Sequence, residues 1–152
     1  MKTLLRGGYV VSGRGCRRAD VLIDGEKVER VGHIPPELAA QSELVDVTGC
    51  MLFPGFIDAH IHLESSLVSP TSFARAVLPH GTTTVITDPH EIANVCGMGG
   101  IDYMMAATEN LPLDVHFMLP SCVPAMAFEE NGATLTWRDI NAYFDHPRVL
   151  GQ

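Results

Sequence analysis

The sequence predicts an α/β fold in which a small β subdomain, residues 1–52, precedes alternating strands and helices over residues 53–152. Three observations support this prediction. Short β-type segments separated by turn residues fill the first third of the chain. After residue 53, β-type segments alternate with segments that have helical periodicity or helix-capping residues. The strands of this second region begin near residues 56, 84, 114 and 148, and spacings of about 30 residues are typical of βα units in a parallel sheet.

A hairpin is the clearest element of the first region. Asp24 and Gly25 separate the apolar run 19–23 from the alternating segment 27–31. An Asp-Gly pair between two such segments favours a tight two-residue turn. The segment 45–47 is a further short strand, so residues 1–52 are expected to form a small β subdomain.

The first two strands of the second region are expected at 56–62 and 82–87. Every residue of the segment 82–87 is β-branched, which favours a strand. Between the two strands, Ser69 is a typical helix N-cap, Pro70 is a typical first helical residue, and Gly81 marks the end of the helix.

Later elements follow the same plan. A helix is expected after the Gly99-Gly100 pair, because apolar side chains then recur at helical spacing, and 113–119 is the third strand. Thr136, with Asp139 three residues later, favours a helix start, and 148–150 begins a fourth strand. A closed (β/α)8 barrel takes about 250 residues. If the second region belongs to such a barrel, the chain reaches only about its fourth strand.

Composition narrows the classes of function. The chain has 152 residues, with 10 Lys and Arg against 18 Asp and Glu, and its net charge of -8 argues against nucleic acid as a partner. No apolar run approaches the roughly 20 residues of a membrane span, and the first residues lack the apolar stretch of a secretory signal. The four cysteines form no Cys-x-x-Cys pair and are expected as free thiols. We therefore expect a cytoplasmic protein without a membrane or nucleic-acid partner.

Polar side chains gather at the end of the strand predicted at 56–62. Because side chains alternate along a strand, Asp58, His60 and His62 are expected on one face and the apolar residues between them on the other. Barrel strands normally direct branched apolar side chains inward, so polar residues at a strand's carboxyl end indicate a function. Two histidines two positions apart can reach one divalent ion, which makes His60 and His62 the candidate metal ligands. The alternative is that they only cap hydrogen bonds at the strand end.

The second strand also runs into a polar segment, at the rim where the first one ends. Asp88, His90 and Glu91 could bind a second ion, orient a ligand or hydrogen-bond to the metal ligands. The alternative is an ordinary loop in which Asp88 caps the next turn. Glu64 is either a further carboxylate of this rim or a solvated loop residue.

A loop framed by two prolines follows the third strand and contains Ser121 and Cys122. Neither residue has a nucleophile-elbow motif around it or a base placed nearby in the sequence. A rigid pocket wall is therefore favoured over a nucleophile.

Four motifs in order resemble the adenine deaminase family of the metal-dependent amidohydrolase superfamily. They are the segments 58–66 (DAHIHLESS), 78–84 (LPHGTTT), 88–94 (DPHEIAN) and 120–125 (PSCVPA). The resemblance spans nearly the whole chain from about residue 20. It implies a β-sandwich built from both chain ends around a (β/α)8 barrel, and the purine-salvage reaction that turns adenine and water into hypoxanthine and ammonia.

The resemblance further implies a binuclear site holding Mn²⁺ or Fe²⁺. His60 and His62 are then ligands of this site, and His90 and Glu91 belong to its surroundings. In the implied mechanism, a metal-activated hydroxide attacks C6 of the purine while a carboxylate shuttles the proton. The substrate is a small purine, and the complete enzyme is expected to be a homo-oligomer.

The end of the sequence departs from the family pattern. The family continues the fourth strand into a Gly-Leu-Ala-Glu stretch whose glutamate bridges the metals, and supplies a catalytic aspartate later, whereas Gln152 stands here at the position of the leucine. We therefore expect an N-terminal fragment that contains no complete catalytic set and is inactive alone. Two alternatives remain. The first is another amidohydrolase, dihydroorotase-like or N-acetylglucosamine-phosphate-deacetylase-like, and the second is a non-catalytic truncated fragment.

Overall fold

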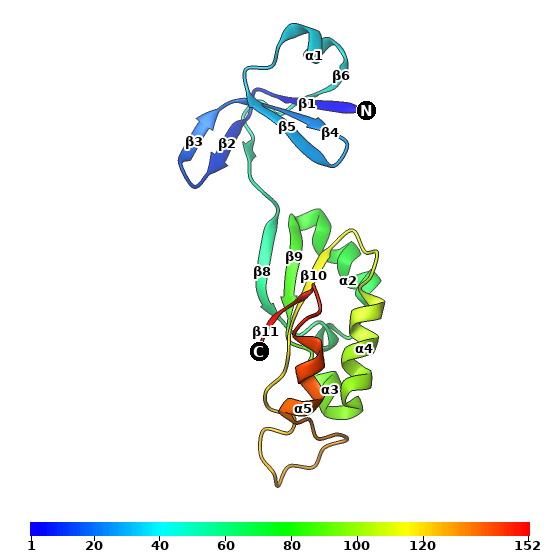
Figure 1. The fold of residues 1–152 in the computed structure, drawn as a ribbon. Helices are drawn as coiled ribbons and strands as arrows, with labels where there is room; N and C mark the ends of the chain where they lie inside the picture. Colours follow the sequence, from blue (N-terminus) through cyan, green and yellow to red (C-terminus); the bar gives the residue numbers. More distant parts are fainter. The chain divides into compact units, whose positions relative to one another are not determined.

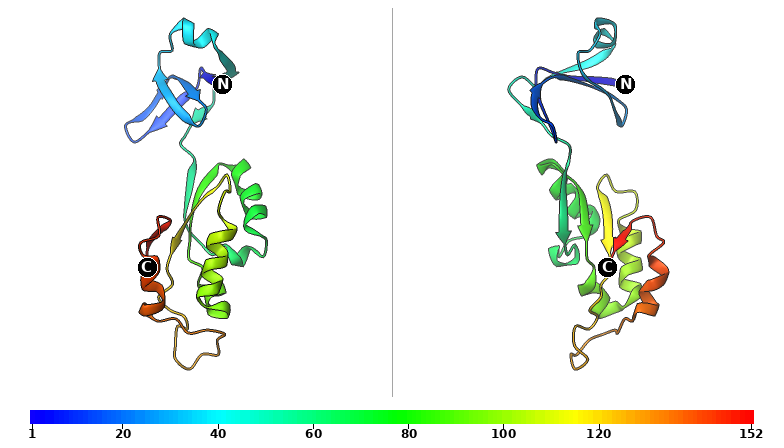
Figure 2. Two further views of the ribbon diagram at one scale, coloured as in Figure 1. Left: turned by 45° about the vertical axis from the view of Figure 1, so that its right-hand side comes forward. Right: turned by 60° about the vertical axis from the view of Figure 1, so that its left-hand side comes forward.

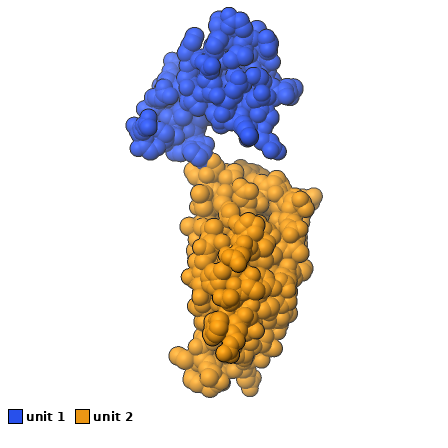
Figure 3. All heavy atoms as spheres, in the orientation of Figure 1, with its two compact units in different colours: residues 1–54 blue, residues 55–152 orange.

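The computed structural model describes residues 1–152 and divides them into two compact units, residues 1–54 and residues 55–152 (Figure 3). The division lies within two residues of the boundary expected from the sequence. No helix in either unit is both long enough and apolar enough to cross a bilayer.

The first unit contains two small sheets (Figure 1). One has the order β5-β4-β1-β6 and the other the order β3-β2-β7. The bounds of the elements are β1 (Lys2–Arg6), β2 (Tyr9–Ser12), β3 (Gly15–Arg18), β4 (Asp20–Asp24), β5 (Lys27–Gly32), α1 (Pro36–Ala40), β6 (Ser42–Asp46) and β7 (Met51–Leu52).

The predicted hairpin of the first unit is confirmed. β4 and β5 pair antiparallel, with Asp24 opposite Lys27 across the turn, and Gly25 has the positive φ of 58° that such a turn needs. Helix α1 is not among the elements expected for this unit, which was predicted to contain strands. Pro36 occupies the first helical turn, where a missing N–H costs nothing.

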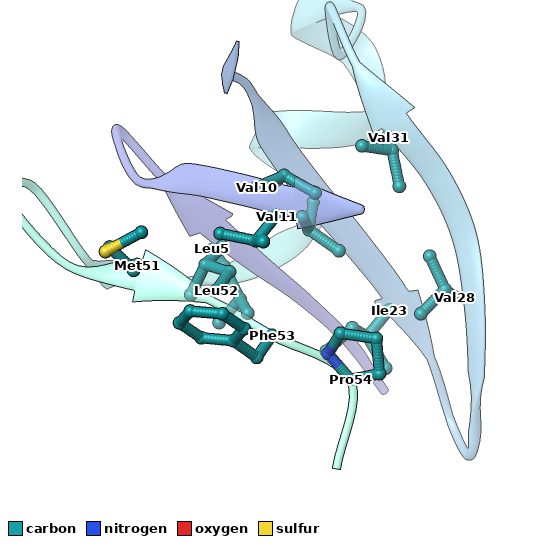
Figure 4. Close-up of a pocket in the computed structure, with 11 residues that line it drawn as sticks. Leu5, Val10, Val11, Ile23, Val28, Val31, Met51, Leu52, Phe53 and Pro54 are labelled. Carbon is teal, nitrogen blue, oxygen red and sulfur yellow. The ribbon is translucent and has the colours of Figure 1, made fainter. Parts of the chain in front are cut away.

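The first unit contains an open apolar pocket. Its buried hydrophobic cluster is small and consists of Leu4, Leu22 and Ile34. The pocket has a volume of about 500 Å³, and side chains of both sheets line it (Figure 4). The lining residues are Leu5, Val10, Val11, Val21, Ile23, Val28, Val31, Met51, Leu52, Phe53 and Pro54.

The second unit is an open, fully parallel four-stranded sheet with the order β11-β10-β9-β8. Helices lie along one side of this sheet, and the core is formed between them and the strands (Figures 1 and 2). The elements are β8 (Phe56–Ile61), α2 (Pro70–Val77), β9 (Thr82–Thr87), α3 (His90–Cys96), α4 (Met98–Ala107), β10 (Asp114–Met118), α5 (Trp137–Ile140) and β11 (Val149–Gly151), with 3-10 turns η1 (Glu64–Ser66), η2 (Leu78–His80) and η3 (Asn141–Tyr143).

The predicted helix ends of the second unit are confirmed. Ser69 Oγ accepts a hydrogen bond from the Ser72 amide at 3.3 Å at the start of α2, and Gly81 follows η2 with a φ of 94°. Thr136 and Asp139 form the expected capping box at α5, in which the Thr136 amide and hydroxyl both donate to Asp139 Oδ2 at 2.7 Å. These two bonds lower the pKa of the Asp139 carboxyl.

Two details differ from the sequence predictions. Residues 90–96 form a helix, α3, rather than part of a loop, and α4 begins at Met98, before the two glycines that were expected to precede it. Gly100 lies inside α4, and a Cβ atom at this position would lie only 2.7 Å from the Ile92 carbonyl oxygen, so the position requires a glycine. This glycine therefore permits close packing of α3 against α4 rather than breaking a helix.

Candidate metal centre

The ends of β8 and β9 bring the candidate residues together. The two strands pair in parallel, so their carboxyl ends reach the same edge of the sheet. His60 belongs to β8 and His62 directly follows it, whereas Asp88 directly follows β9 and His90 is the first residue of α3. The Asp88 amide donates to the Ile61 carbonyl at 3.0 Å, which joins the two strand ends.

The simple alternation expected along β8 is wrong. The register shifts between Asp58 and Ile61, because Asp58 pairs with Val85 and Ile61 pairs with Thr87. Paired residues of parallel strands face the same side, so Asp58 shares a side with Ile61 although three positions separate them. Asp58 therefore stands directly before an interruption of the strict period of two. Its carboxylate accepts a hydrogen bond from the His60 amide at 3.2 Å.

Three half-buried side chains form a candidate metal group: His62, Asp88 and His90. Each offers one ligand atom, and these atoms all lie within 4.8 Å of one another. His60 is exposed and lies outside this group, but its ring meets the His62 ring edge-on at a centroid distance of 4.9 Å. The His62 and His90 rings are similarly edge-on at 4.6 Å, so three imidazoles follow one another along the rim.

Hydrogen bonds orient two of these rings for metal binding. His62 Nδ1 lies 2.8 Å from the Asp88 carbonyl oxygen, and because a carbonyl can only accept, Nδ1 carries the proton. His90 Nδ1 lies 3.2 Å from Asp88 Oδ2 in the same manner. In the neutral form of each ring, the Nε2 atom then carries the lone pair. Such Nδ1 contacts are typical of metal-binding histidines.

Asp88 supports the assignment through its second carboxylate oxygen. Oδ1 is buried and has no hydrogen-bond partner, although a buried carboxylate oxygen without one is costly. A cation between Asp88 and the two imidazoles would remove this cost. Two imidazole nitrogens and a carboxylate oxygen form a donor set that suits Mn²⁺, Fe²⁺ or Zn²⁺, so the residues present fit a divalent ion.

Glu64, Ser65 and Glu91 connect the same two segments beside the metal group. Glu64 Oε1 accepts hydrogen bonds from the amides of Glu91 at 3.1 Å and Ile92 at 3.2 Å. Ser65 Oγ donates to Glu91 Oε1 at 2.6 Å. Glu64 therefore binds the start of α3, and neither of its two sequence interpretations described that contact.

A pocket of about 380 Å³ lies beside the metal group. His90, Glu91 and Asn94 line it from α3, and Cys122 lines it from the loop after β10. Ser121 of the same loop is exposed and is not among the lining residues. Asn94 was not singled out in the sequence, although its position four residues after His90 on a helix places both on one face.

His116 on β10 is a further polar residue that the sequence did not single out. Its Nδ1 atom is buried and has no hydrogen-bond partner. Its spacing to the other histidines does not match a metal-ligand pattern, so only the three-dimensional structure reveals this buried nitrogen without a partner.

Several known proteins are similar to this chain. Residues 51–149 match the model of the Amidohydrolase family. The adenine deaminase of Clostridium acetobutylicum is 54% identical over 134 residues, which is 88% of this chain and 23% of that protein. The adenine deaminase of Bacillus velezensis is 50% identical over 151 residues, 98% of this chain and 25% of that protein. The resemblance to adenine deaminases is confirmed, and the chain spans about a quarter of the length of these relatives.

Solved structures are similar to the chain at lower sequence identity. D-hydantoinase from Bacillus sp. AR9 superimposes with a TM-score of 0.59 at 28% identity, covering 77% of this chain and 26% of that protein. Dihydropyrimidinase from Brevibacillus agri has a TM-score of 0.59 at 27% identity, covering 78% of this chain and 27% of that protein. The predicted α/β class with a parallel sheet is confirmed.

Proposed function

Because the chain belongs to the Amidohydrolase family, we propose that it forms part of an adenine deaminase, which hydrolyses adenine to hypoxanthine and ammonia. The observation that carries this proposal is the close likeness to adenine deaminases, at 50% identity over nearly the whole chain. The likeness to D-hydantoinase is weaker, at 28% identity. The group formed by His62, Asp88 and His90 could hold a metal ion, which supports the proposal.

The proposed fold of the whole protein is a (β/α)8 barrel with a composite β-sandwich. The four parallel strands of the second unit would be the first strands of the barrel. The candidate ligands lie at the carboxyl ends of two of them, β8 and β9, where active-site residues of such barrels lie. The apolar pocket of the first unit supports the sandwich, because further strands could cover its lining.

The metal centre is proposed to be binuclear and to hold Mn²⁺ or Fe²⁺. His62, Asp88 and His90 would hold one ion, while His60, whose ring contacts the His62 ring, would contribute to a second. When bound, the metal supplies a Lewis acid that makes water a stronger nucleophile near neutral pH. The Asp88 carbonyl and carboxylate hold the two rings in position for this purpose.

The pocket beside His90 is proposed to receive the purine. Its volume of about 380 Å³ is in the range of small-molecule sites. Asn94 could pair with the adenine edge, because an amide donates and accepts in the pattern that matches the exocyclic amine and the neighbouring ring nitrogen. Glu91 and Cys122 also line this pocket.

A second candidate substrate is a cyclic amide, favoured by the likeness to D-hydantoinase and dihydropyrimidinase. The two reactions can be separated directly. Adenine and dihydrouracil would be offered to the metal-loaded protein, both as residues 1–152 and as a protein extended to the full length of its relatives, and ammonia release and ring opening would be measured.

We expect adenine turnover by the extended protein and none by residues 1–152, which offer one group of three metal donors. The His62→Ala variant is the matched control and should lose both bound metal and turnover. Ring opening of dihydrouracil without deamination of adenine would overturn the adenine proposal. Deamination by residues 1–152 alone would overturn the expectation that this chain is insufficient.

A further inference from the structure

The start of helix α3 lacks a cap from its own neighbourhood. Pro89 is the N-cap residue, and its ring offers no side-chain acceptor to the first-turn amides. Unpaired amides at a helix start need acceptors from elsewhere, and a negative charge is favourable there. Glu64 supplies both from 27 residues earlier, because its Oε1 atom accepts from the Glu91 and Ile92 amides.

The contact is reciprocal. While the Glu64 carboxylate accepts from the backbone of α3, the Ser65 hydroxyl donates to the Glu91 carboxylate at 2.6 Å. Two adjacent residues of η1 are thus bonded to the first turn of α3. Leu63, which precedes them, is only 1% exposed and fixes the turn in the core of the second unit.

Along the sequence, the histidines of the metal group lie between this contact and the paired strand ends. On one side the Asp88 amide bonds to the Ile61 carbonyl, and on the other Glu64 bonds to the α3 amides. His62 is two residues before Glu64, and His90 directly precedes Glu91. The Glu64 contact therefore joins the two histidine-bearing segments a second time, beyond His62 and His90 in the sequence.

We infer that Glu64 is a positioning residue for the metal centre, which holds the first turn of α3 against η1 and thereby sets the separation of His62 and His90. This inference rests on the proposed metal site. Glu64 is not a member of the group whose donor atoms lie within 4.8 Å of one another. Its Oε2 atom, like Asp88 Oδ1, is buried without a hydrogen-bond partner, so the test has to distinguish a positioning residue from a ligand.

Two nearly isosteric substitutions test the inference. In Glu64→Gln the amide oxygen still accepts from Glu91 and Ile92, whereas in Glu64→Leu the volume remains but the acceptor is gone. Co²⁺ would be titrated into each variant, with affinity and the visible absorption of the bound ion as readouts. Removing a partner that orients metal ligands typically lowers metal affinity about 10- to 100-fold. We expect this loss and an altered spectrum for Glu64→Leu, and near wild-type behaviour for Glu64→Gln.

Further variants separate positioning from general stability. Ser65→Ala removes only the return bond and should give a smaller loss, about threefold. Glu43→Leu makes the same chemical change on exposed β6 of the other unit and should leave the Co²⁺ spectrum unchanged. Wild-type affinity and spectrum in a folded Glu64→Leu variant would overturn the inference. An equal loss in Glu64→Gln would also overturn it, because the carboxylate would then act as a ligand itself.

Amide hydrogen exchange keeps this test independent of the proposed function. Without metal, the Glu91 and Ile92 amides should be protected in the wild type and should exchange at least about tenfold faster in Glu64→Leu. If the wild-type chain binds no Co²⁺, the metal proposal fails while the exchange data still report the Glu64 contact. If the amides exchange equally fast in both proteins, the positioning role fails whatever the metal does.

Discussion

β8 and the inner strands β9 and β10 differ in how they are held. Val85 and Thr87 of β9 and Phe117 of β10 are fully buried, and both strands pair on two sides. β8 pairs only with β9, its register is interrupted, and Ile57 is 63% exposed. Yet both kinds of strand supply the metal group. The histidine-bearing end of β8 is therefore held by hydrogen bonds at the rim together with the buried Leu63, whereas the central residues of β9 and β10 lie in the core themselves.

The largest expected effect separates core from edge. Phe117→Ala should destabilise the second unit by about 3–5 kcal/mol, because truncating a buried aromatic loses its packing and leaves a cavity. Ile57→Ala is the matched control on β8 and should change stability by less than about 0.5 kcal/mol. Urea unfolding followed by circular dichroism measures both. Similar losses for the two variants would show that β8 is packed as firmly as β10.

The next effect concerns the choice of ligands at the rim. His90→Ala removes a member of the donor group and should weaken Co²⁺ binding by at least about 100-fold, more than the loss of an orienting partner. His60→Ala should weaken binding by residues 1–152 less than about tenfold, because His60 lies outside that group. Isothermal titration of the two variants decides between them. A larger loss for His60→Ala would favour the His60 and His62 pair expected from the sequence.

A smaller effect tests the link between the two strand ends. Thr87 Oγ1 accepts from the Leu63 amide at 3.4 Å, and both residues are buried. Thr87→Val keeps the shape but leaves this amide without its acceptor, which should cost about 1 kcal/mol. Thr83→Val on the exposed part of the same strand is the control and should be nearly neutral. Thermal unfolding of both variants measures the difference, and an equally neutral Thr87→Val would show that this bond contributes nothing to holding β8.

Local signals made much of the fold predictable. Three predicted elements depend only on residues within their own segment, and each was found in place: the β-branched run 82–87, the Ser69-Pro70 helix start and the Asp24-Gly25 turn. Helix α3 was missed because Asp88-Pro89 is typical of a turn. Gly100 was misinterpreted because its reason is an approach to Ile92 of another helix.

The site was only partly predictable, because contacts between separate elements bring its residues together. The polar residues at the two strand ends stand out in the sequence, since polar side chains there interrupt an apolar pattern. Their grouping does not, because the register of β8 shifts between Asp58 and Ile61 and the three grouped donors follow two different strands. The bonds from Glu64 to the start of α3 join positions 27 apart, and no local pattern indicates such a contact.

The parallel pairing of the second unit also has a consequence for the order of folding. β4 and β5 meet across a turn in which Asp24 pairs with Lys27, and hairpins of this kind form within about 1–10 μs. In the parallel sheet, Phe56 pairs with Thr82 and Thr84 with Asp114, so the intervening chain loses loop entropy before each contact can form. As the chain emerges during synthesis, the β4-β5 hairpin is therefore expected to take shape before the rim that gathers the three imidazoles exists.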